Sequence, residues 1–217
     1  MNIANTINTI YCDFDGTITK NDSVNRFFEM YASKNWIDSE KLWIEGKISS
    51  RENAIIQVSL LKNVSQQQLD DYINSIEIDD YFLDFVDYTI SNNIKLTILS
   101  DGFDLFIKKV LERYNLDIPF YANKLIYENG KFSIEFPHYN QNCDKKAGMC
   151  KCQKVKENSL CYIGDGTSDL CIATKADLLF ASKNLHKYCK KNKIKHSHFT
   201  SFRNIIDILE ERDFKNE

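Results

Sequence analysis

The sequence of 217 residues contains no apolar run approaching the roughly 20 residues that a membrane-spanning helix needs. Basic residues are not in excess either: 28 Lys and Arg stand against 31 Asp and Glu, for a formal net charge of -3. This balance gives no general reason to bind nucleic acid or an anionic membrane. The first residues show no basic segment followed by an apolar core, so we expect no secretory signal and a cytoplasmic location.

Cysteine occurs seven times, and the odd number argues against a fully paired disulfide framework. In a chain without an export signal, we expect these thiols to be reduced. Cys143, Cys150 and Cys152 follow His138 closely, which makes a zinc site one reading of this segment. Because the spacing is not a paired C-x-x-C arrangement, buried or idle thiols are the other reading, and the sequence leaves both open.

The sequence does contain enough apolar material for a packed core. Hydrophobic residues make up 43% of the chain and aromatic residues 12%. The length suits one sizeable domain with an insertion. No internal repeat and no low-complexity linker divides the chain, so we expect a globular protein.

A β-leaning apolar segment at residues 7–12 predicts the first strand. Residues 22–78 then show helical periods and no convincing strand. After Asp79 the pattern alternates, with β-rich runs at 95–100 and 160–164 separated by helical segments. Strands separated by helices imply a parallel sheet with right-handed crossovers. We therefore predict an α/β fold class with a Rossmann-like parallel sheet as its core.

The predicted organisation is a catalytic α/β core of residues 1–19 and 79–217. An α-helical bundle cap, residues 20–78, is inserted after the first strand and lies over the carboxyl edge of the sheet as a lid. One hairpin is also predicted within residues 121–136, where Asn129 and Gly130 separate two apolar runs.

Two carboxylates stand two residues apart where the first predicted strand ends, in the run Asp13-Phe14-Asp15-Gly16-Thr17. Side chains alternate along an extended chain, so Asp13 and Asp15 point the same way, into the crevice beyond the strand's carboxyl end. Two bare carboxylates repel each other there unless a hard cation neutralises them. The pattern therefore predicts a Mg²⁺ site that is also a catalytic site.

A later β-rich run ends in Ser100-Asp101-Gly102, directly before a predicted helix. The hydroxyl group and the flexible main-chain amides at this point form an anion cradle. Lys151, at the start of a short predicted helix, adds a positive charge. We assign these four residues to phosphate binding, with Lys154 one helical turn later as the alternative lysine.

Two more carboxylates follow the next strand end. We predict that Asp165 joins Asp13 and the main-chain carbonyl of Asp15 in holding Mg²⁺, because oxygen ligands suit a hard cation. Asp169 lies one turn further on. We predict that it orients metal-bound water or Lys151 without itself binding the metal.

This set of residues fits the hydrolysis of a phosphomonoester. Asp13 is the predicted nucleophile, which attacks phosphorus in line and forms an aspartyl phosphate. Asp15 is the predicted general acid for the leaving oxygen, and then the general base for the water that breaks the intermediate. Ser100 and Lys151 stabilise charge on the outer oxygens of the transferring group. The expected partner is thus a small phosphorylated molecule, and the expected cofactor is Mg²⁺.

The four motifs resemble those of the haloacid dehalogenase superfamily of phosphatases: residues 13–17, Ser100, Lys151 and residues 164–169, in that order. The helical insertion after the first motif resembles the small bundle cap of the phosphoserine phosphatase-like branch. The segment 136–151 looks closer still to a group in that branch, the methionine-salvage phosphatases acting on 2-hydroxy-3-keto-5-methylthiopentenyl-1-phosphate. The resemblance implies a phosphatase with an α/β core and a helical cap.

Three other functions compete with this interpretation. Cation-pumping ATPases of the same superfamily resemble D-K-T-G-T, lack a carboxylate at the position of Asp15 and need membrane spans, and this sequence matches neither feature. A phosphomutase or other phosphotransferase stays open, since Asp15 permits it. The third is a metal-binding regulatory protein whose site is catalytically inactive. All the expected catalytic side chains are present in the sequence, which argues against this hypothesis.

Substrate choice should come from the cap. Arg26, Lys47 and Arg51 are candidates there for binding a second anionic group. The sequence does not indicate the physiological substrate or the oligomeric state.

Overall fold

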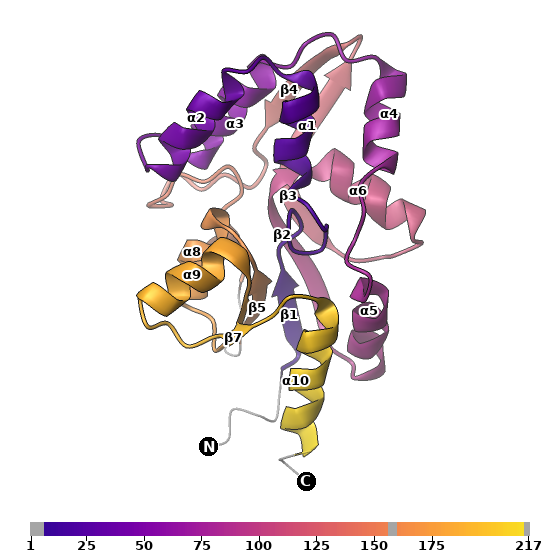
Figure 1. The fold of residues 1–217 in the computed structure, drawn as a ribbon, viewed down its shortest axis with the longest axis vertical. Coiled ribbons are helices and arrows are strands. Elements are labelled where there is room, and N and C mark those ends of the chain that lie inside the picture. The colour runs from indigo at the N-terminus through magenta and orange to yellow at the C-terminus, as the bar shows by residue number, and fades with distance from the viewer. Residues whose placement is uncertain (1–6, 156–159, 215–217) are drawn as a thin grey trace.

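The computed structural model describes residues 7–155 and 160–214, and within them a seven-stranded sheet lies at the centre (Figure 1). Its strands, in spatial order, are β4 (Lys131–Glu135), β3 (Phe120–Glu128), β2 (Lys95–Phe103), β1 (Thr9–Cys12), β5 (Cys161–Gly164), β6 (Leu178–Ala181) and β7 (Ser197–His198). Neighbouring strands are parallel, except that β3 and β4 are antiparallel. The predicted α/β class with a mostly parallel, Rossmann-like sheet is confirmed.

The chain enters the sheet near its middle. β1 pairs with β2 on one side and with β5 on the other, and the chain builds outward to β4 before it crosses back to β5. At such a reversal of strand order, the connections diverge and leave a crevice beyond the carboxyl ends of the strands. The three strands that meet there carry the polar residues picked out in the sequence.

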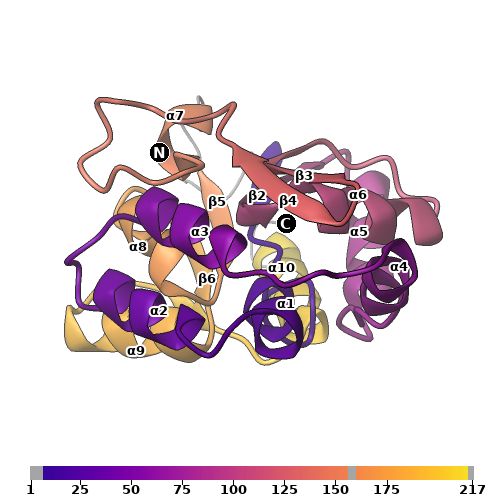
Figure 2. The same cartoon turned by 90° about the horizontal axis from the view of Figure 1, so that it is seen from above.

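Helices connect the strands and cover the sheet (Figures 1 and 2). They are α1 (Ser23–Tyr31), α2 (Trp36–Ile44), α3 (Ser50–Ser59), α4 (Gln66–Asn74), α5 (Phe82–Ser91), α6 (Asp104–Arg113), α7 (Lys151–Lys154), α8 (Leu170–Ala173), α9 (Lys183–Lys191) and α10 (Phe202–Phe214). A 3₁₀ turn, η2 (Thr167–Asp169), precedes α8. No described helix combines the length and apolar character that a membrane crossing requires.

Successive residues of β1 enter different apolar clusters. Ile10 and Cys12 belong to the cluster that α5, α6 and α10 complete, whereas Tyr11 belongs to the one completed by α8 and α9. This separation follows from the two-residue period of an extended chain. A strand buried on both faces reads as a continuous apolar run, which is why this segment was visible in the sequence.

The hairpin expected within residues 121–136 is confirmed as β3 and β4. Asn129 and Gly130 join the two strands with φ angles of 50° and 80°. Positive φ at both positions is what the favoured two-residue hairpin turn requires.

The short helix predicted to begin near Lys151 is α7, which has four residues. Cys150 and Val155 bound it with extended backbone angles. The N–H group of Met149 donates to the side chain of Asp101 (2.8 Å), which ties the segment before α7 to the end of β2.

Between β1 and β2 the chain forms an insertion, and α1 to α4 of this insertion lie over the carboxyl edge of the sheet (Figures 1 and 2). Its two ends lie side by side. Thr19 and Ile78 form an antiparallel bridge, flanked by main-chain hydrogen bonds of 2.8 and 3.0 Å. We call this paired segment, residues 18–20 and 77–79, the stalk.

Aromatic side chains join the insertion to the core. The ring of Phe27, on α1, lies 5.2 Å from that of Phe106 on α6 and 5.7 Å from that of Phe132 on β4. Phe28 lies 6.0 Å from Phe103 at the end of β2. Both α1 side chains are fully buried, and the insertion shares one hydrophobic cluster with the sheet. The insertion is therefore anchored at α1 by close packing.

We predict that Phe27→Ala lowers the free energy of unfolding by about 3–5 kcal/mol, because it leaves a cavity where insertion and core meet. Met30 lies on the same helix but is 57% exposed, so Met30→Ala should change that free energy by only about 0.5 kcal/mol. Urea unfolding followed by circular dichroism measures both. Equal stability of the two variants would contradict the proposed anchoring.

Candidate active site

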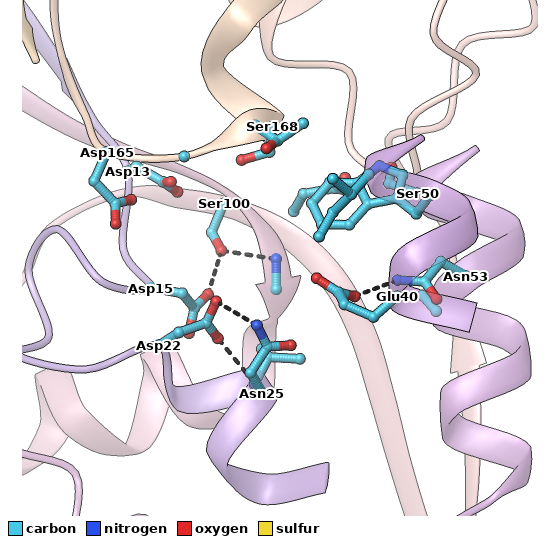
Figure 3. A pocket seen from close by; sticks show the side chains of 18 of the residues that line it. Asp13, Asp15, Asp22, Asn25, Glu40, Ser50, Asn53, Ser100, Asp165 and Ser168 are labelled. Atoms are coloured by element: carbon cyan, nitrogen blue, oxygen red, sulfur yellow. Dashed lines mark hydrogen bonds between the residues drawn. The ribbon is translucent and has the colours of Figure 1, made fainter. Parts of the chain in front are cut away.

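A cavity of about 270 Å³ lies between the carboxyl edge of the sheet and helices α1 to α3 (Figure 3). Its core wall contains six of the predicted site residues: Asp13, Asp15, Ser100, Asp101, Gly102 and Asp165. Residues from near the start of α1, from α2 and from α3 form the opposite wall. The structure thus brings the three predicted strand ends together at one cavity.

Lys151 is buried, and its ammonium group joins two carboxylates. Nζ lies 2.9 Å from Asp13 Oδ1 and 2.5 Å from Asp169 Oδ1. It also donates to the hydroxyl groups of Tyr162 (3.1 Å) and Ser168 (3.2 Å). Burial opposes the charged form of Lys151, but the two carboxylates more than offset this and raise its pKa above the ordinary value. Lys151 is therefore a fixed positive charge beside Asp13.

The carboxylate of Asp15 is held between two hydroxyl groups. Ser100 Oγ donates to Asp15 Oδ2 (2.9 Å), and Ser23 Oγ donates to Oδ1. A Cβ atom at Gly102 would lie 2.1 Å from Asp15 Oδ2, so this approach requires glycine. Burial raises the pKa of Asp15 and outweighs the opposing effect of the two hydroxyl groups. The site therefore favours the protonated carboxyl group more than water does.

The turn after β1 touches the residue that follows β5. Thr17 Oγ1 donates to Asp165 Oδ1 (3.2 Å), and Lys183 Nζ lies 3.2 Å from Oδ2. Lys183 also donates to the main-chain carbonyl of Gly16. Gly16 has φ 76°, and a Cβ atom there would lie 2.6 Å from Asp165 Oδ2. Glycine is thus required both by the turn and by the close approach of Asp165.

Three carboxylates are close enough to share a cation. Asp13, Asp165 and Asp169 each offer one oxygen atom, and these atoms lie within 4.8 Å of one another. Asp169 already accepts hydrogen bonds at both oxygens, from Lys151 at one and from the N–H groups of Asp165 (3.0 Å) and Gly166 (2.9 Å) at the other. Asp13 and Asp165 therefore fit a hard divalent cation best, and Asp169 fits a supporting position.

The charge state of the site also favours a cation. Burial, followed by the charge of Asp169, raises the pKa of both Asp13 and Asp165. Ionising these carboxylates together is costly because like charges in a buried site repel. A divalent cation bound between them removes that cost.

The remaining predicted residues lie as follows. The carboxylate of Asp101 accepts from Asn123 Nδ2 (3.0 Å) as well as from a main-chain N–H, so it braces the loop before α7. Its contribution to phosphate binding would therefore come from its main-chain amide. Lys154 Nζ lies 4.5 Å from the centre of the Tyr121 ring. Lys151, and not Lys154, contacts Asp13.

The cysteines considered for zinc line a different cavity. Cys143, Cys150 and Cys152 lie along it with Cys171, whereas the His138 ring packs 5.1 Å from that of Tyr121. In the described part of the chain, the group of metal-ligating side chains with atoms within 4.8 Å of one another is the aspartate cluster. The positions of the thiols do not support the zinc reading.

None of the three cap cations lines the described active-site cavity. Lys47 pairs with a neighbouring glutamate at the surface. The guanidinium of Arg51 lies over the rings of Phe136 (5.1 Å) and Tyr139 (4.9 Å), and Arg26 lines a separate small cavity. Their positions do not support a second anion site built from these residues.

The sequence did not reveal Ser23, Tyr162 or Lys183 as parts of the site. Asp22 takes the N-cap position of α1 by accepting from Asn25 N–H (2.9 Å), which leaves Ser23 to contact Asp15. The two-residue period of β5 could have indicated the position of Tyr162, because Tyr162 faces the opposite side of the sheet from Cys161 and Ile163. Lys183 is 167 positions from Gly16, to whose main-chain carbonyl it donates, and no local sequence pattern predicts that contact.

The model of the haloacid dehalogenase-like hydrolase family matches residues 10–174 of this chain. The chain therefore belongs to the haloacid dehalogenase-like hydrolases. It is similar to 2-hydroxy-3-keto-5-methylthiopentenyl-1-phosphate phosphatase of Bacillus velezensis, with 30% identity over 208 residues, 93% of this chain and 89% of that protein. The phosphatase of the same name from Brevibacillus brevis is 30% identical over 210 residues, 93% of this chain and 95% of that protein.

Solved structures share the fold. A substrate-bound phosphoserine phosphatase complex has a TM-score of 0.71 at 21% identity, covering 94% of this chain and 98% of that chain. A phospho-aspartyl intermediate analogue of phosphoserine phosphatase has a TM-score of 0.70 at 23% identity, covering 93% and 98%. The resemblance to the superfamily found in the sequence is confirmed, and the two phosphoserine phosphatase structures share the fold of this chain.

We predict that Lys151→Met lowers the free energy of unfolding by about 3–5 kcal/mol at neutral pH, because Asp13 and Asp169 lose their buried cation. Lowering the pH should recover part of the loss as Asp13, whose pKa is raised mainly by burial, takes up a proton. Lys154→Met, on the same helix, should cost about 1 kcal/mol or less. Denaturant unfolding in magnesium-free buffer measures both variants, and similar losses for the two would remove the special place given to Lys151.

Proposed function

We propose that this protein is a magnesium-dependent phosphatase that hydrolyses a small-molecule phosphomonoester through an aspartyl-phosphate intermediate. The observation that carries the proposal is the setting of Asp13. Its Oδ1 accepts from Lys151 and from the N–H of Phe14 (2.8 Å), while among the described residues no protein donor is assigned to Oδ2. A carboxylate held at one oxygen and open at the other, at the base of a cavity, suits attack on phosphorus.

In the first step, Asp13 forms a bond to phosphorus as the bond to the ester oxygen breaks. Asp15 gives its proton to that leaving oxygen, and its raised pKa favours the protonated form this step needs. In the second step, Asp15 takes a proton from water as the water attacks phosphorus, which releases phosphate and restores Asp13. Ser100 keeps Asp15 oriented throughout.

The outer oxygens of the transferring group need donors and positive charge. We propose that Lys151, whose ammonium group contacts Asp13, and the main-chain amides after β2 provide them. Asp13, Asp165 and the main-chain carbonyl of Asp15 would hold Mg²⁺, which when bound neutralises the like charges of carboxylate and phosphate. We further propose that residues 20–78 act as the cap, which limits the access of bulk water to the cavity.

The physiological substrate has to be found among small phosphorylated metabolites. The similar proteins named above are phosphatases of 2-hydroxy-3-keto-5-methylthiopentenyl-1-phosphate, so that compound belongs in a panel of phosphorylated metabolites. p-Nitrophenyl phosphate serves as the general test compound. Release of phosphate without an added sugar-phosphate cofactor separates a phosphatase from a phosphomutase.

We predict that Asp13→Asn lowers the kcat/KM for p-nitrophenyl phosphate on the order of 10³-fold or more, because the nucleophile is lost. EDTA should abolish wild-type turnover, and added Mg²⁺ should restore it. Asp87→Asn, an exposed change on α5, is the matched control and should keep wild-type turnover. The function would be rejected if the purified protein shows no magnesium-dependent turnover on this compound or on the panel.

We predict that Asp15→Asn lets the phosphoenzyme form from p-nitrophenyl phosphate, whose leaving group needs little protonation, but slows its hydrolysis. Intact-protein mass spectrometry after acid quenching should then show one added phosphoryl group. The double variant Asp13→Asn, Asp15→Asn should show none. Steady-state turnover of Asp15→Asn equal to that of the wild type would remove the acid–base assignment.

A further inference from the structure

The cavity wall opposite the catalytic carboxylates carries a carboxylate of its own. Glu40, on α2, accepts at Oε2 from Asn53 Nδ2 (2.8 Å) and from Gln57 Nε2 (3.0 Å), both on α3. All three residues line the cavity. Figure 3 shows Glu40 between Asn53 and the open space in front of Asp15 and Ser100. Glu40 is therefore held from behind by two amide groups.

The hold on Glu40 is rigid. Asn53 and Gln57 are only 4% and 3% exposed, so their amide groups have little freedom to turn. Asn53 Oδ1 is buried without a partner among the described residues, and turning the amide to use it would set that oxygen against the Glu40 carboxylate. The amide nitrogen must therefore face Glu40. This arrangement fixes one carboxylate oxygen and leaves the other, Oε1, without an assigned protein donor in the described chain.

The surroundings of Glu40 determine what that oxygen can receive. The described lining residues supplied by the insertion include the carboxylates of Asp22 and Glu40 but no Lys, Arg or His. Trp43 and Ile44, also on α2, add apolar surface beside Glu40. This wall accepts hydrogen bonds and repels negative charge. The apolar side chains of this wall provide a surface against which a partly apolar substrate chain can pack.

We propose that Glu40 is a specificity-determining residue. It accepts a hydrogen bond from a hydroxyl or ammonium group at the far end of the substrate, and Asn53 and Gln57 are positioning residues that act through it. The substrate class is then a small phosphomonoester with a short, partly apolar chain ending in a hydrogen-bond donor. A second anionic group at that end is rejected. This inference rests on the proposed phosphatase function and adds to it the direction of substrate choice.

The test uses a matched series of alkyl phosphates of three to five carbons that end in methyl, hydroxyl, ammonium or carboxylate. For wild-type protein, kcat/KM at the best chain length should be about tenfold or more higher for a donor-terminated compound than for its methyl counterpart. The carboxylate compound should be the poorest. The hydroxyl and ammonium arms separate a neutral donor from a cationic one, since the second gains from the charge of Glu40.

In Glu40→Gln, the ratio of kcat/KM between ammonium- and methyl-terminated compounds should fall about tenfold or more, and the relative rate of the carboxylate compound should rise. Most of the change should appear in KM for the donor-terminated compounds. Glu45→Gln, an exposed change on the same insertion, is the matched control and should keep the wild-type ratios.

Asn53→Ala and Gln57→Met should shift the ratios in the same direction as Glu40→Gln. In the Glu40→Gln background these two substitutions should add little, because each of the three substitutions disrupts the same interaction, the one between Glu40 and the substrate. A purely structural role would instead slow every compound equally and leave the ratios unchanged. Gln57→Met keeps the side-chain length, so the test survives if Asn53→Ala folds poorly.

The outcomes separate the two proposals. Hydrolysis of the series with ratios near one, or ratios that Glu40→Gln leaves unchanged, overturns the inference and leaves the phosphatase function standing. Turnover of p-nitrophenyl phosphate with none of the series accepted also overturns it. Absence of turnover on every compound, with magnesium present, rejects the phosphatase function itself.

Discussion

The site depends on one buried ammonium group. Lys151 lies between Asp13 and Asp169, and without it two buried carboxylates would face each other with no cation between them. The cation fixes the side chain at the end of β1 relative to the one after β5, although the two strands belong to distant parts of the chain. Tyr162, within β5, completes the arrangement: its hydroxyl group accepts from Lys151 Nζ and donates to Asp169 Oδ1. The geometry of the proposed catalytic site and the stability of the core therefore depend on the same contact.

The opposite walls of the cavity come from different parts of the fold. The sheet edge supplies the groups proposed to act on phosphorus, and their mutual positions follow from strand register and from close approaches that only glycine permits. The insertion supplies Glu40 and its supporting amides from two short helices. On the proposed roles, changes on those helices would alter what is bound without moving the carboxylates at the sheet edge. This separation is a physical reason why one core can serve many substrates.

The sequence predicted the parts that depend on local rules. The alternation of an extended chain placed Asp13 and Asp15 together, and Asn129-Gly130 fixed the hairpin. Both hold because neighbouring residues decide them. The supporting contacts of Glu40 need α2 and α3 to pack together, so the four-residue spacing of Asn53 and Gln57 on one helix face does not predict them by itself. Lys183 bonds to a residue 167 positions away, which no local pattern reveals.

The stalk has a consequence for the architecture as a whole. Because residues 18–20 and 77–79 already pair, excising what lies between them would leave two chain ends that a short turn can join, as in proteins that accept whole-domain grafts. The excised core would nevertheless present Phe103 and Phe106 to water, an exposed patch that favours self-association. A replacement insertion must therefore carry aromatic side chains that cover Phe103 and Phe106. Joining the chain ends correctly is not sufficient to keep the resulting protein from self-associating.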